Sequence, residues 1–407
     1  MMCYSISMEI WNEIKNKKCI ILVSGGPDSM ALVHMAMSRK LDITLVSVNY
    51  HVRATSKKDI ELLQSFALRF QIPFYIFDAH NLIGNFQSKA RDFRYQKAME
   101  VAETVGAEVI LTAHHLDDHL ETHLWQLKRN HKPLYFGIKP KTWLKNFMLV
   151  RPCLMISKDR LIQYNKEHNI PFVVDESNFS QKYTRNVIRQ QCLSMSEAQK
   201  DKILKELNEA NQQIDYVIQA LIPQMSKHGV DVSWFKTLNQ EHQHLCLRVF
   251  LNEHKSIKAT KNALNQFCLH LDHKDYHQYF SPVYLLVHYG MINVFLPLKA
   301  QIQIINNEFE LKNADLTMYE QSLKDFPCTF FEEDFPLVLR FAKPKDRLQI
   351  KVGRKKVFNW FSEKKIPRIA RQTWPVIENA EKQVIYVKGW GADLIHRTNI
   401  QSHFMIK

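Results

Sequence analysis

The first half of the chain alternates short runs of β-branched and apolar residues with longer amphipathic stretches. This alternation is typical of a parallel sheet whose strands are joined by helices on both of its faces. Strands are expected at residues 19–23, 43–48, 74–77 and 109–111, and crossover helices at 30–38, 57–70 and 87–105. The sequence therefore predicts a doubly wound α/β domain that occupies residues 1–195.

Beyond this domain the hydrophobic pattern changes. A long amphipathic segment at residues 196–225 predicts a linker helix. Residues 226–324 combine helical periodicity with short strand patterns and predict a small mixed α/β middle domain, whose role the sequence leaves open. Residues 325–407 show alternating strand patterns around a short helix, which predicts a small C-terminal α+β domain.

The composition limits the class of protein and its partners. Hydrophobic residues make up 45% of the chain and charged residues 24%, as in soluble globular proteins. A net charge of +14 attracts polyanions, and nucleic acid is the leading candidate, although a solvated basic face would give the same charge. The chain has no apolar run long enough to cross a bilayer and no signal peptide pattern, so we expect a cytoplasmic protein with no membrane partner.

The seven cysteines are scattered, without a CxxC pair or the Cys/His spacing of a zinc site. This predicts free thiols in a reducing compartment. The oligomeric state stays open, and a homodimer is one of the options.

A short glycine-bearing motif follows the first expected strand and precedes the first expected helix. It consists of Ser24, Gly25, Gly26, Pro27, Asp28 and Ser29. A strand, a glycine turn and a helix N-terminus together form an anion site, because backbone N–H groups and the helix dipole face the anion. Asp28 adds a hard oxygen ligand of the kind that Mg²⁺ prefers. The alternative is an ordinary Gly-Gly turn.

The motif SGGPDS resembles the SGGxDS loop of the N-type ATP pyrophosphatases. These enzymes cleave ATP between its α and β phosphates. The resemblance implies that ATP binds at this loop with Mg²⁺, but it does not select one enzyme of the superfamily.

A second polar motif, TAHHLDD, follows the strand expected at 109–111. His114 and Asp118 are four residues apart, so a helical turn would place them on one face at the carboxyl edge of the sheet, where open α/β folds bind ligands. Such a pair could hold Mg²⁺ or take a proton from an attacking amine. Alternatively, the carboxylates cap a helix beside a surface histidine.

Arg91 and Arg94 share one face of the helix expected at 87–105, a spacing suited to a phosphate or phosphodiester. A solvated basic face is the alternative. Two further polar clusters, at residues 175–178 and 184–189, are explained by turn capping about as well as by function.

Taken in order, these segments resemble the tRNA(Ile)-lysidine synthetase family. The likeness covers SGGPDS, KARDFRY, TAHHLDD, RPCL, DESN and TRNVIR, and it extends into the last 80 or so residues. Two features depart from the family pattern. Residues 130–136 stand where a glycine-rich segment is usual, so the segment that admits the anticodon would be stiffer or differently placed. Lys345 stands where glycine is common.

The resemblance implies a specific two-step reaction. ATP adenylates the C2 carbonyl oxygen of the wobble cytidine in an isoleucine tRNA with a CAU anticodon, and the ε-amine of free L-lysine then displaces AMP. By position, the 24–29 loop would cradle pyrophosphate, and Asp28 and Asp118 would manage Mg²⁺. His114 and Asp118 would handle lysine and its proton, and Arg91 or Arg94 would steady the α-phosphate.

The C-terminal segment from Arg340 to Arg371 contains twelve Lys or Arg residues and two acidic residues, a net charge of +10. We expect it to bind tRNA phosphates, because it concentrates most of the chain's charge excess. The candidate residues are Arg354, Lys355, Lys356, Lys364, Lys365, Arg368 and Arg371. Trp360 and Phe361 would stack on bases or form the local core, and we favour the core.

Two other functions compete with this interpretation. A tRNA thiolation enzyme of the same superfamily would use the same adenylation, but such enzymes generally carry paired cysteines. A noncatalytic RNA-binding protein could retain an ATPase-like fold. Release of pyrophosphate from ATP would distinguish that protein from an enzyme.

Overall fold

The computed structural model describes residues 9–51, 56–79, 86–130, 132–173, 184–226, 229–255, 259–298, 302–397 and 404–406. The chain divides into two compact units, Met1–Tyr216 and Val217–Lys407. Each unit is described below by itself.

A six-stranded sheet forms the centre of the first unit. Its strands are β1 (Cys19–Leu22), β2 (Ile43–Asn49), β3 (Phe74–Asp78), β4 (Val109–Leu111), β5 (Lys141–Leu144) and β6 (Phe147–Val150), in the order β3-β2-β1-β4-β6-β5. All neighbouring strands are parallel except β5, which pairs antiparallel with β6. The predicted doubly wound sheet is therefore confirmed, and the β5–β6 hairpin is an addition that the sequence did not predict.

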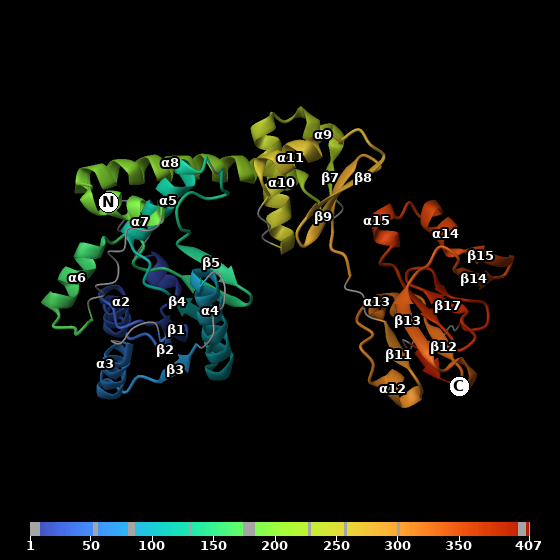
Figure 1. Cartoon of the computed structure of the whole chain (residues 1–407), viewed down its shortest axis with the longest axis horizontal. Helices are drawn as coiled ribbons and strands as arrows, with labels where there is room; N and C mark the ends of the chain where they lie inside the picture. The colour runs from blue at the N-terminus through green and yellow to red at the C-terminus, as the bar shows by residue number, and fades with distance from the viewer. Residues whose placement is uncertain are drawn as a thin grey trace. The chain divides into compact units, whose positions relative to one another are not determined.

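Helices cover both faces of this sheet (Figure 1). On one face lie α2 (Pro27–Ser38), α3 (Ser56–Arg69) and α6 (Lys158–Glu167), whose apolar side chains join one core cluster with alternate residues of the strands. On the other face, α4 (Phe86–Val105) packs on the intervening residues, such as Ile20 and Ile110. The alternation of side chains along each strand supplies both cores.

Three further helices form a separate apolar cluster in the first unit. They are α5 (Leu116–Lys128), α7 (Thr184–Ser194) and α8 (Glu197–Leu221). Leu120, Ile188 and Leu204, one from each helix, are buried together. The segment expected as a linker helix is thus packed along its first turns, and buried polar residues Lys200 and Asn211 lie on the same helix.

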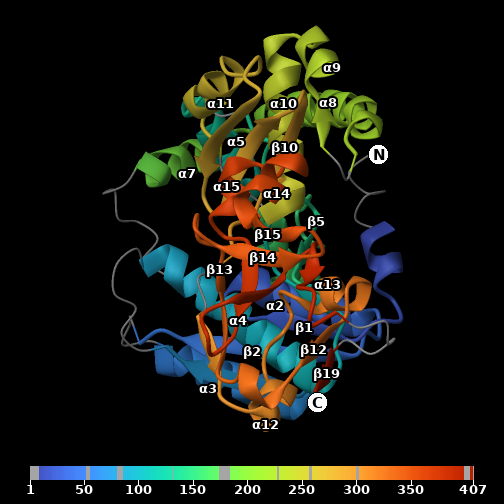
Figure 2. The same cartoon turned by 90° about the vertical axis from the view of Figure 1, so that its right-hand side faces the viewer.

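The second unit begins with a small antiparallel sheet and three helices (Figures 1 and 2). The strands are β7 (Val230–Asp231), β8 (Asp275–Phe280), β9 (Val283–His288) and β10 (Met291–Phe295), in the order β7-β10-β9-β8. The helices are α9 (Val232–Thr237), α10 (Gln240–Lys255) and α11 (Lys261–Cys268), preceded by the 3-10 turn η2 (Ile222–Gln224). Buried Phe235, Phe250 and Phe267 join them to the sheet in one core.

The rest of the second unit is built on a five-stranded sheet. Its strands, in the order β11-β13-β16-β17-β18, are β11 (Gln303–Ile305), β13 (Leu337–Phe341), β16 (Pro375–Glu378), β17 (Val384–Val387) and β18 (Gly391–Ala392). Around it lie β12 (Cys328–Phe330), η3 (Glu332–Asp334), β14 (Arg347–Ile350), β15 (Gly353–Lys356), β19 (Phe404–Ile406), α12 (Glu308–Lys312), α13 (Glu320–Asp325), α14 (Val357–Glu363) and α15 (Arg368–Arg371). Strand β11 and helices α12 and α13 belong to this core, because β11 pairs with β13. The sequence pattern had placed them in the middle domain.

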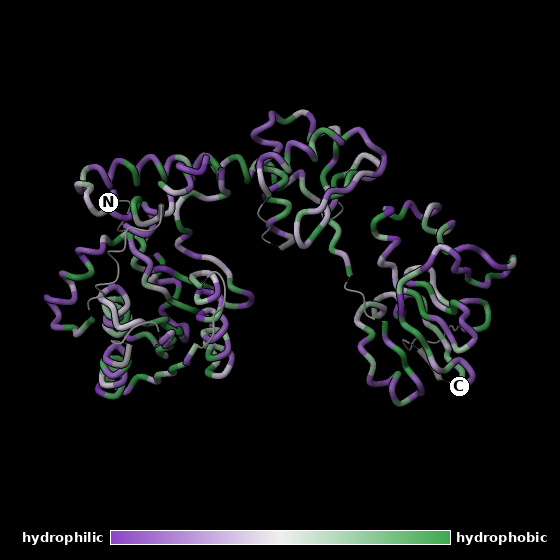
Figure 3. The backbone as a smooth tube through the Cα atoms, viewed as in Figure 1, coloured by the Kyte–Doolittle hydropathy of each residue, from purple (hydrophilic) through white to green (hydrophobic). Residues whose placement is uncertain are grey.

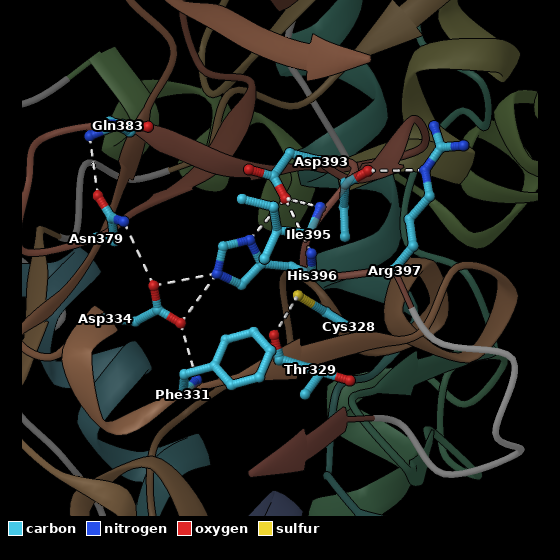
Figure 4. Close-up of polar contacts among 11 residues, drawn as sticks. Cys328, Thr329, Phe331, Asp334, Asn379, Gln383, Asp393, Ile395, His396 and Arg397 are labelled. Atoms are coloured by element: carbon cyan, nitrogen blue, oxygen red, sulfur yellow. Dashed lines mark hydrogen bonds and ion pairs between the residues drawn. The ribbon is translucent and has the colours of Figure 1, made fainter. Parts of the chain in front are cut away.

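A buried ion network fixes the end of this unit (Figure 4). The His396 ring lies between two carboxylates, with Nδ1 at 2.6 Å from Asp393 Oδ1 and Nε2 at 3.0 Å from Asp334 Oδ2. Asn379 donates a further hydrogen bond to Asp334. Burial alone would lower the pKa of His396, but the two carboxylates outweigh it and raise the pKa to about 9. The network therefore holds a charged imidazolium at neutral pH.

Six of the seven cysteines lie in the described part of the chain, and all six are free, as predicted; Cys3 lies outside the described residues. No helix in the described part is long and apolar enough to cross a bilayer.

Candidate active site

The 24–29 motif spans the turn after β1 and the first three residues of α2. Gly25 has φ +77°, a conformation that favours glycine, and a Cβ there would meet the backbone oxygen of Asp59 at 3.4 Å. Gly26 is the extended N-cap of α2, and Pro27 starts the helix. The Ser29 hydroxyl accepts the Ser24 N–H and donates to the Gly26 carbonyl, so it braces the turn. The helix N-terminus is thereby presented at the edge of the sheet as an anion site.

Two carboxylates lie at this turn, and both face the same nitrogen of one imidazole. Asp28, in the first turn of α2, has Oδ2 at 3.7 Å from His115 Nε2. Asp118, in the first turn of α5, has Oδ2 at 3.4 Å from the same nitrogen. The loop before α5 therefore joins the phosphate turn in a single site, although the two motifs are about 90 residues apart in the sequence.

The predicted shared helix face of His114 and Asp118 is wrong. Helix α5 begins at Leu116, so His114 precedes it, and the N-cap is His115 with extended backbone (φ −122°, ψ 179°). The His115 N–H donates to Asp118 Oδ2 at 3.2 Å, so the capping alternative describes Asp118 correctly. Periodicity misled the prediction because an N-cap residue is extended, and the helical repeat starts only after it.

His114 nevertheless belongs to the site. Its Nδ1 lies 2.9 Å from the Thr112 hydroxyl. Burial, reinforced by Arg151, Arg91 and Arg94, lowers the pKa of His114 to about 4, and Asp118 opposes this shift. The imidazole is therefore neutral at pH 7 in the ligand-free protein.

The two arginines predicted to bind phosphate reach the site from α4. Both act electrostatically on His114, and their guanidinium carbons lie 5.4 Å (Arg91) and 5.9 Å (Arg94) from the centre of the Tyr95 ring. Arg94 Nε is buried without a hydrogen-bond partner. An unsatisfied buried donor close enough to His114 to affect its pKa fits an anionic ligand in this site.

Several residues of the site were not predicted. His115 contacts both carboxylates, and Lys158 lowers the pKa of Asp28 together with His115, while burial raises it overall. Arg151 is buried near His114 and donates to the Lys139 carbonyl. The adjacent histidines of TAHHLDD and the arginine of RPCL were the only sequence signals for these residues.

One predicted cluster cannot be placed. Residues 175–178 lie outside the described part of the chain. From the cluster at 184–189, Arg189 lies close enough to Asp28 to lower its pKa.

The atypical segment after α5 is anchored by buried side chains. Gln126 Oε1 accepts the Gly137 N–H at 2.7 Å, and His119 Nδ1 accepts the Ile138 N–H at 2.8 Å. Asn211, on α8, bonds both the N–H and the carbonyl of Phe136, at 2.7 and 3.1 Å. These contacts tie Phe136, Gly137 and Ile138 to α5 and α8.

The two carboxylates fit Mg²⁺ that arrives with a nucleotide. Among the residues that the structure describes, no group of three or more His, Cys, Asp or Glu side chains could hold a metal ion. Mg²⁺ does not need such a group, because it is commonly bound by one or two carboxylates plus substrate phosphates. Asp28 Oδ1 is buried without a hydrogen-bond partner, as an unfilled ligand position would be.

The basic C-terminal residues divide into exposed and structural ones. In the β14–β15 hairpin, hydrophilic in Figure 3, Arg347 lies opposite Lys356 and Gln349 opposite Arg354, and the three cations are exposed. Like charges directly opposite destabilise a sheet, so this face is suited to a polyanion. Lys364, Lys365 and Arg368 are also exposed.

Other basic residues of this segment are occupied within the fold, which corrects part of the prediction. Lys355 is half-buried and pairs with Glu363 at 2.5 Å, and Arg371 donates to Ile366 O and to Ser362 Oγ. Arg340 is buried between Asp346 and Glu378. These three cations are engaged within the fold because each lies close in space to a carboxylate or another hydrogen-bond acceptor. The sequence pattern does not reveal these partners. Trp360 and Phe361 are buried, as favoured.

Comparison with known families agrees with this geometry. Residues 4–195 match the family model of the PP-loop domain, which defines the class as ATP-binding PP-loop proteins. Residues 337–402 match the model of the TilS substrate C-terminal domain.

Individual relatives specify the family. The chain is 31% identical to the tRNA(Ile)-lysidine synthase of Malacoplasma penetrans over 259 residues, 61% of this chain and 87% of that protein. It is 30% identical to the enzyme of the same name from Shouchella clausii over an alignment of 419 positions that covers 90% of this chain and 89% of that protein. The chain therefore belongs to the tRNA(Ile)-lysidine synthase family. It is a ligase that modifies tRNA with ATP.

Proposed function

We propose that this enzyme joins free L-lysine to C2 of the wobble cytidine of an isoleucine tRNA with a CAU anticodon, in two steps at the site between α2 and α5. The observation that carries the proposal is the placement of Asp28 and Asp118 around His115 at the phosphate turn. Family membership supports the choice of tRNA and of lysine.

In the first step, the C2 oxygen of the cytidine attacks the α-phosphorus of ATP, and the bond to the bridging oxygen of the β-phosphate breaks. The N–H groups at the start of α2 face the leaving pyrophosphate, and the helix dipole favours its charge. Arg91 or Arg94 steadies the α-phosphate. Mg²⁺, held by Asp28 and Asp118, supplies charge neutralisation when it is bound.

In the second step, the ε-amine of lysine attacks C2, the C2–O bond breaks, and AMP leaves with the oxygen. The amine must lose protons to form the product, so a base is required near C2. His114 is neutral at pH 7, and nearby phosphate charge would raise its pKa from about 4 toward the range useful for a base. Asp118 attracts the ammonium of the incoming lysine.

The alternatives are less well supported by the residues that the structure describes. Burial raises the pKa of Cys153 to about 12 and of Cys192 to about 11, so these thiols are poorly suited to sulfur transfer. A noncatalytic RNA-binding protein would have no need for an unsatisfied carboxylate at a phosphate turn. Free, buried thiols also support a reducing compartment, which we take to be the cytoplasm.

The decisive experiment combines the purified protein with ATP, Mg²⁺, labelled lysine and an isoleucine tRNA with a CAU anticodon. Label should enter this tRNA with release of pyrophosphate and AMP, and it should not enter a methionine tRNA with the same anticodon. Pyrophosphate release without label in the tRNA would reject lysine as the nucleophile. No pyrophosphate release at all would reject the adenylation step.

A further inference from the structure

In the sequence, Asp117 lies between the site residues His115 and Asp118, but its side chain bonds to residues of α6 and α8. Its Oδ2 accepts the Lys158 N–H at the start of α6 at 2.8 Å, and its Oδ1 accepts from Lys200 Nζ, on α8, at 2.8 Å. Asp117 therefore joins the first turns of three helices, α5, α6 and α8. One of these, α5, carries Asp118.

The Lys200–Asp117 pair is buried at both ends. Lys200 is 3% exposed and Asp117 7% exposed. Burial alone would raise the pKa of Asp117, but the bonds from Lys200 and Lys158 outweigh it and lower that pKa. A buried ion pair is a poor source of net stability, because the desolvation cost of the charges offsets much of their attraction. The pair does, however, fix the positions of the helices that it joins.

Asp117 also lies close to the central imidazole of the site. Its Oδ2 is 3.6 Å from His115 Nδ1, on the opposite side of the ring from Asp28 and Asp118, which face Nε2. Without Lys200, the Asp117 charge would be left with one backbone hydrogen bond and would compete for His115. The ring and the first turn of α5 would then shift away from Asp28.

We propose that Lys200 is a positioning residue for the reaction. Through Asp117, it fixes the first turn of α5, and it thereby sets the separation of the Asp28 and Asp118 carboxylates that receive the nucleotide with Mg²⁺. This inference rests on the proposed function only for the identity of the carboxylates' ligand. Helix α8, which the sequence predicts to be a linker, thereby contributes to the reaction.

The test measures Mg²⁺-dependent nucleotide binding. The affinity for α,β-methylene-ATP, which cannot be cleaved at the reacting bond, is measured with and without Mg²⁺ by calorimetry. The Mg²⁺ gain is the factor by which Mg²⁺ raises the affinity for the nucleotide. In Lys200→Met, this gain should fall about 10- to 100-fold, as for other residues that orient metal ligands. The rate of pyrophosphate release should fall by a similar factor. Lys205→Met is the matched control, because Lys205 lies on the same helix, is exposed, and has its Nζ 4.0 Å from Glu209. It should behave as wild type.

A second pair of variants tests the route through Asp117. In an Asp117→Asn background, Lys200→Met should cause no further loss, because the charge that Lys200 restrains is gone. Lys200→Arg should retain most of the Mg²⁺ gain. A folded Lys200→Met protein with an unchanged Mg²⁺ gain would overturn the proposal.

If Lys200→Met does not fold, the Mg²⁺ gain of Asp117→Asn is compared with that of the double variant. A smaller gain in the double variant rejects the proposal. Failure of the proposed function looks different. In that case, the wild-type protein binds the nucleotide with Mg²⁺ but does not incorporate lysine, whatever Lys200 does.

Discussion

Burial of Asp28 without a partner for Oδ1 is the most informative single-residue feature of the site. Burial, the largest effect, raises its pKa, while His115 and Lys158 oppose the rise, so a positive charge nearby favours the ionised carboxylate. A Mg²⁺ ion that arrives with ATP would supply such a charge. The residue is therefore adapted to the loaded site more than to the empty one.

We expect Asp28→Asn to remove nearly all adenylation, because a metal contact to the transferring phosphates is worth several kcal/mol in the transition state. The fold should be unaffected, since the substitution keeps the shape of the side chain. Pyrophosphate release measures the activity, and circular dichroism checks the fold. Wild-type release by a folded variant would exclude Asp28 from the reaction.

His114→Ala should slow lysine transfer more than adenylation, so adenylated tRNA should accumulate. Loss of a general base costs about 10²- to 10⁴-fold in rate. Single-turnover assays with labelled ATP and labelled lysine separate the two steps. Equal slowing of both steps would instead assign His114 to the adenylation step or to the structure of the site.

Among the elements, the β14–β15 hairpin is the clearest candidate for tRNA contact. Arg354→Gln combined with Lys356→Gln should weaken tRNA binding and reduce the slope of log affinity against log salt by about two units, one for each lost phosphate contact. Lys355→Gln should have a smaller effect, because Lys355 is paired with Glu363. An unchanged slope in the double variant would place the tRNA contacts on other residues.

The ion network around His396 should make the stability of the C-terminal sheet depend on pH. The folded-state pKa of His396, about 9, lies above its ordinary value of 6.5, so its contribution is complete below about pH 6.5 and is lost as the pH rises through 9. The pKa of Asp334 is lowered, because its hydrogen bonds, chiefly the one with His396, outweigh burial, so its contribution is lost instead as the pH falls below the ordinary range of a carboxyl group.

His396→Ala should destabilise this region by about 3–5 kcal/mol near pH 6, because it leaves two buried carboxylates without their cation. Hydrogen–deuterium exchange of residues 328–330 and 393–397 measures the loss. The difference from wild type should shrink toward pH 10. A difference that does not vary with pH would show that packing of the ring, and not its charge, is what stabilises the network.

At the scale of the whole molecule, charge and chemistry lie on different compact units. The phosphate turn and its carboxylates belong to Met1–Tyr216, whereas the exposed basic hairpin belongs to Val217–Lys407. Added salt should therefore weaken tRNA binding steeply and change the affinity for Mg²⁺ and α,β-methylene-ATP much less. Binding measured for both ligands over one salt series tests this. Equal salt dependence for the two ligands would contradict it.

The sequence determined the local features of this protein. The strands β1 to β4 and the glycine turn at Gly25 follow from patterns within a few residues, because strand alternation and a positive φ are local properties. The helix after this turn was expected at 30–38, whereas α2 begins at Pro27, because proline has the φ of a first helical residue. The phosphate turn and the place of Asp28 in it could thus be predicted, whereas the roles implied for His114 and the two arginines of α4 stay predictions.

The tertiary structure decided which distant residues meet. Lys200 bonds to Asp117, which is 83 residues away in the sequence, and Asn211 bonds to Phe136, which is 75 residues away. His115 meets Asp28 as well as its sequence neighbour Asp118 because α2 and α5 start at the same edge of the sheet. Arg340 counts as a basic residue in the sequence but is neutralised by Asp346 and Glu378 in the fold. Charge and burial depend on neighbours in space, so the sequence pattern alone could not assign them.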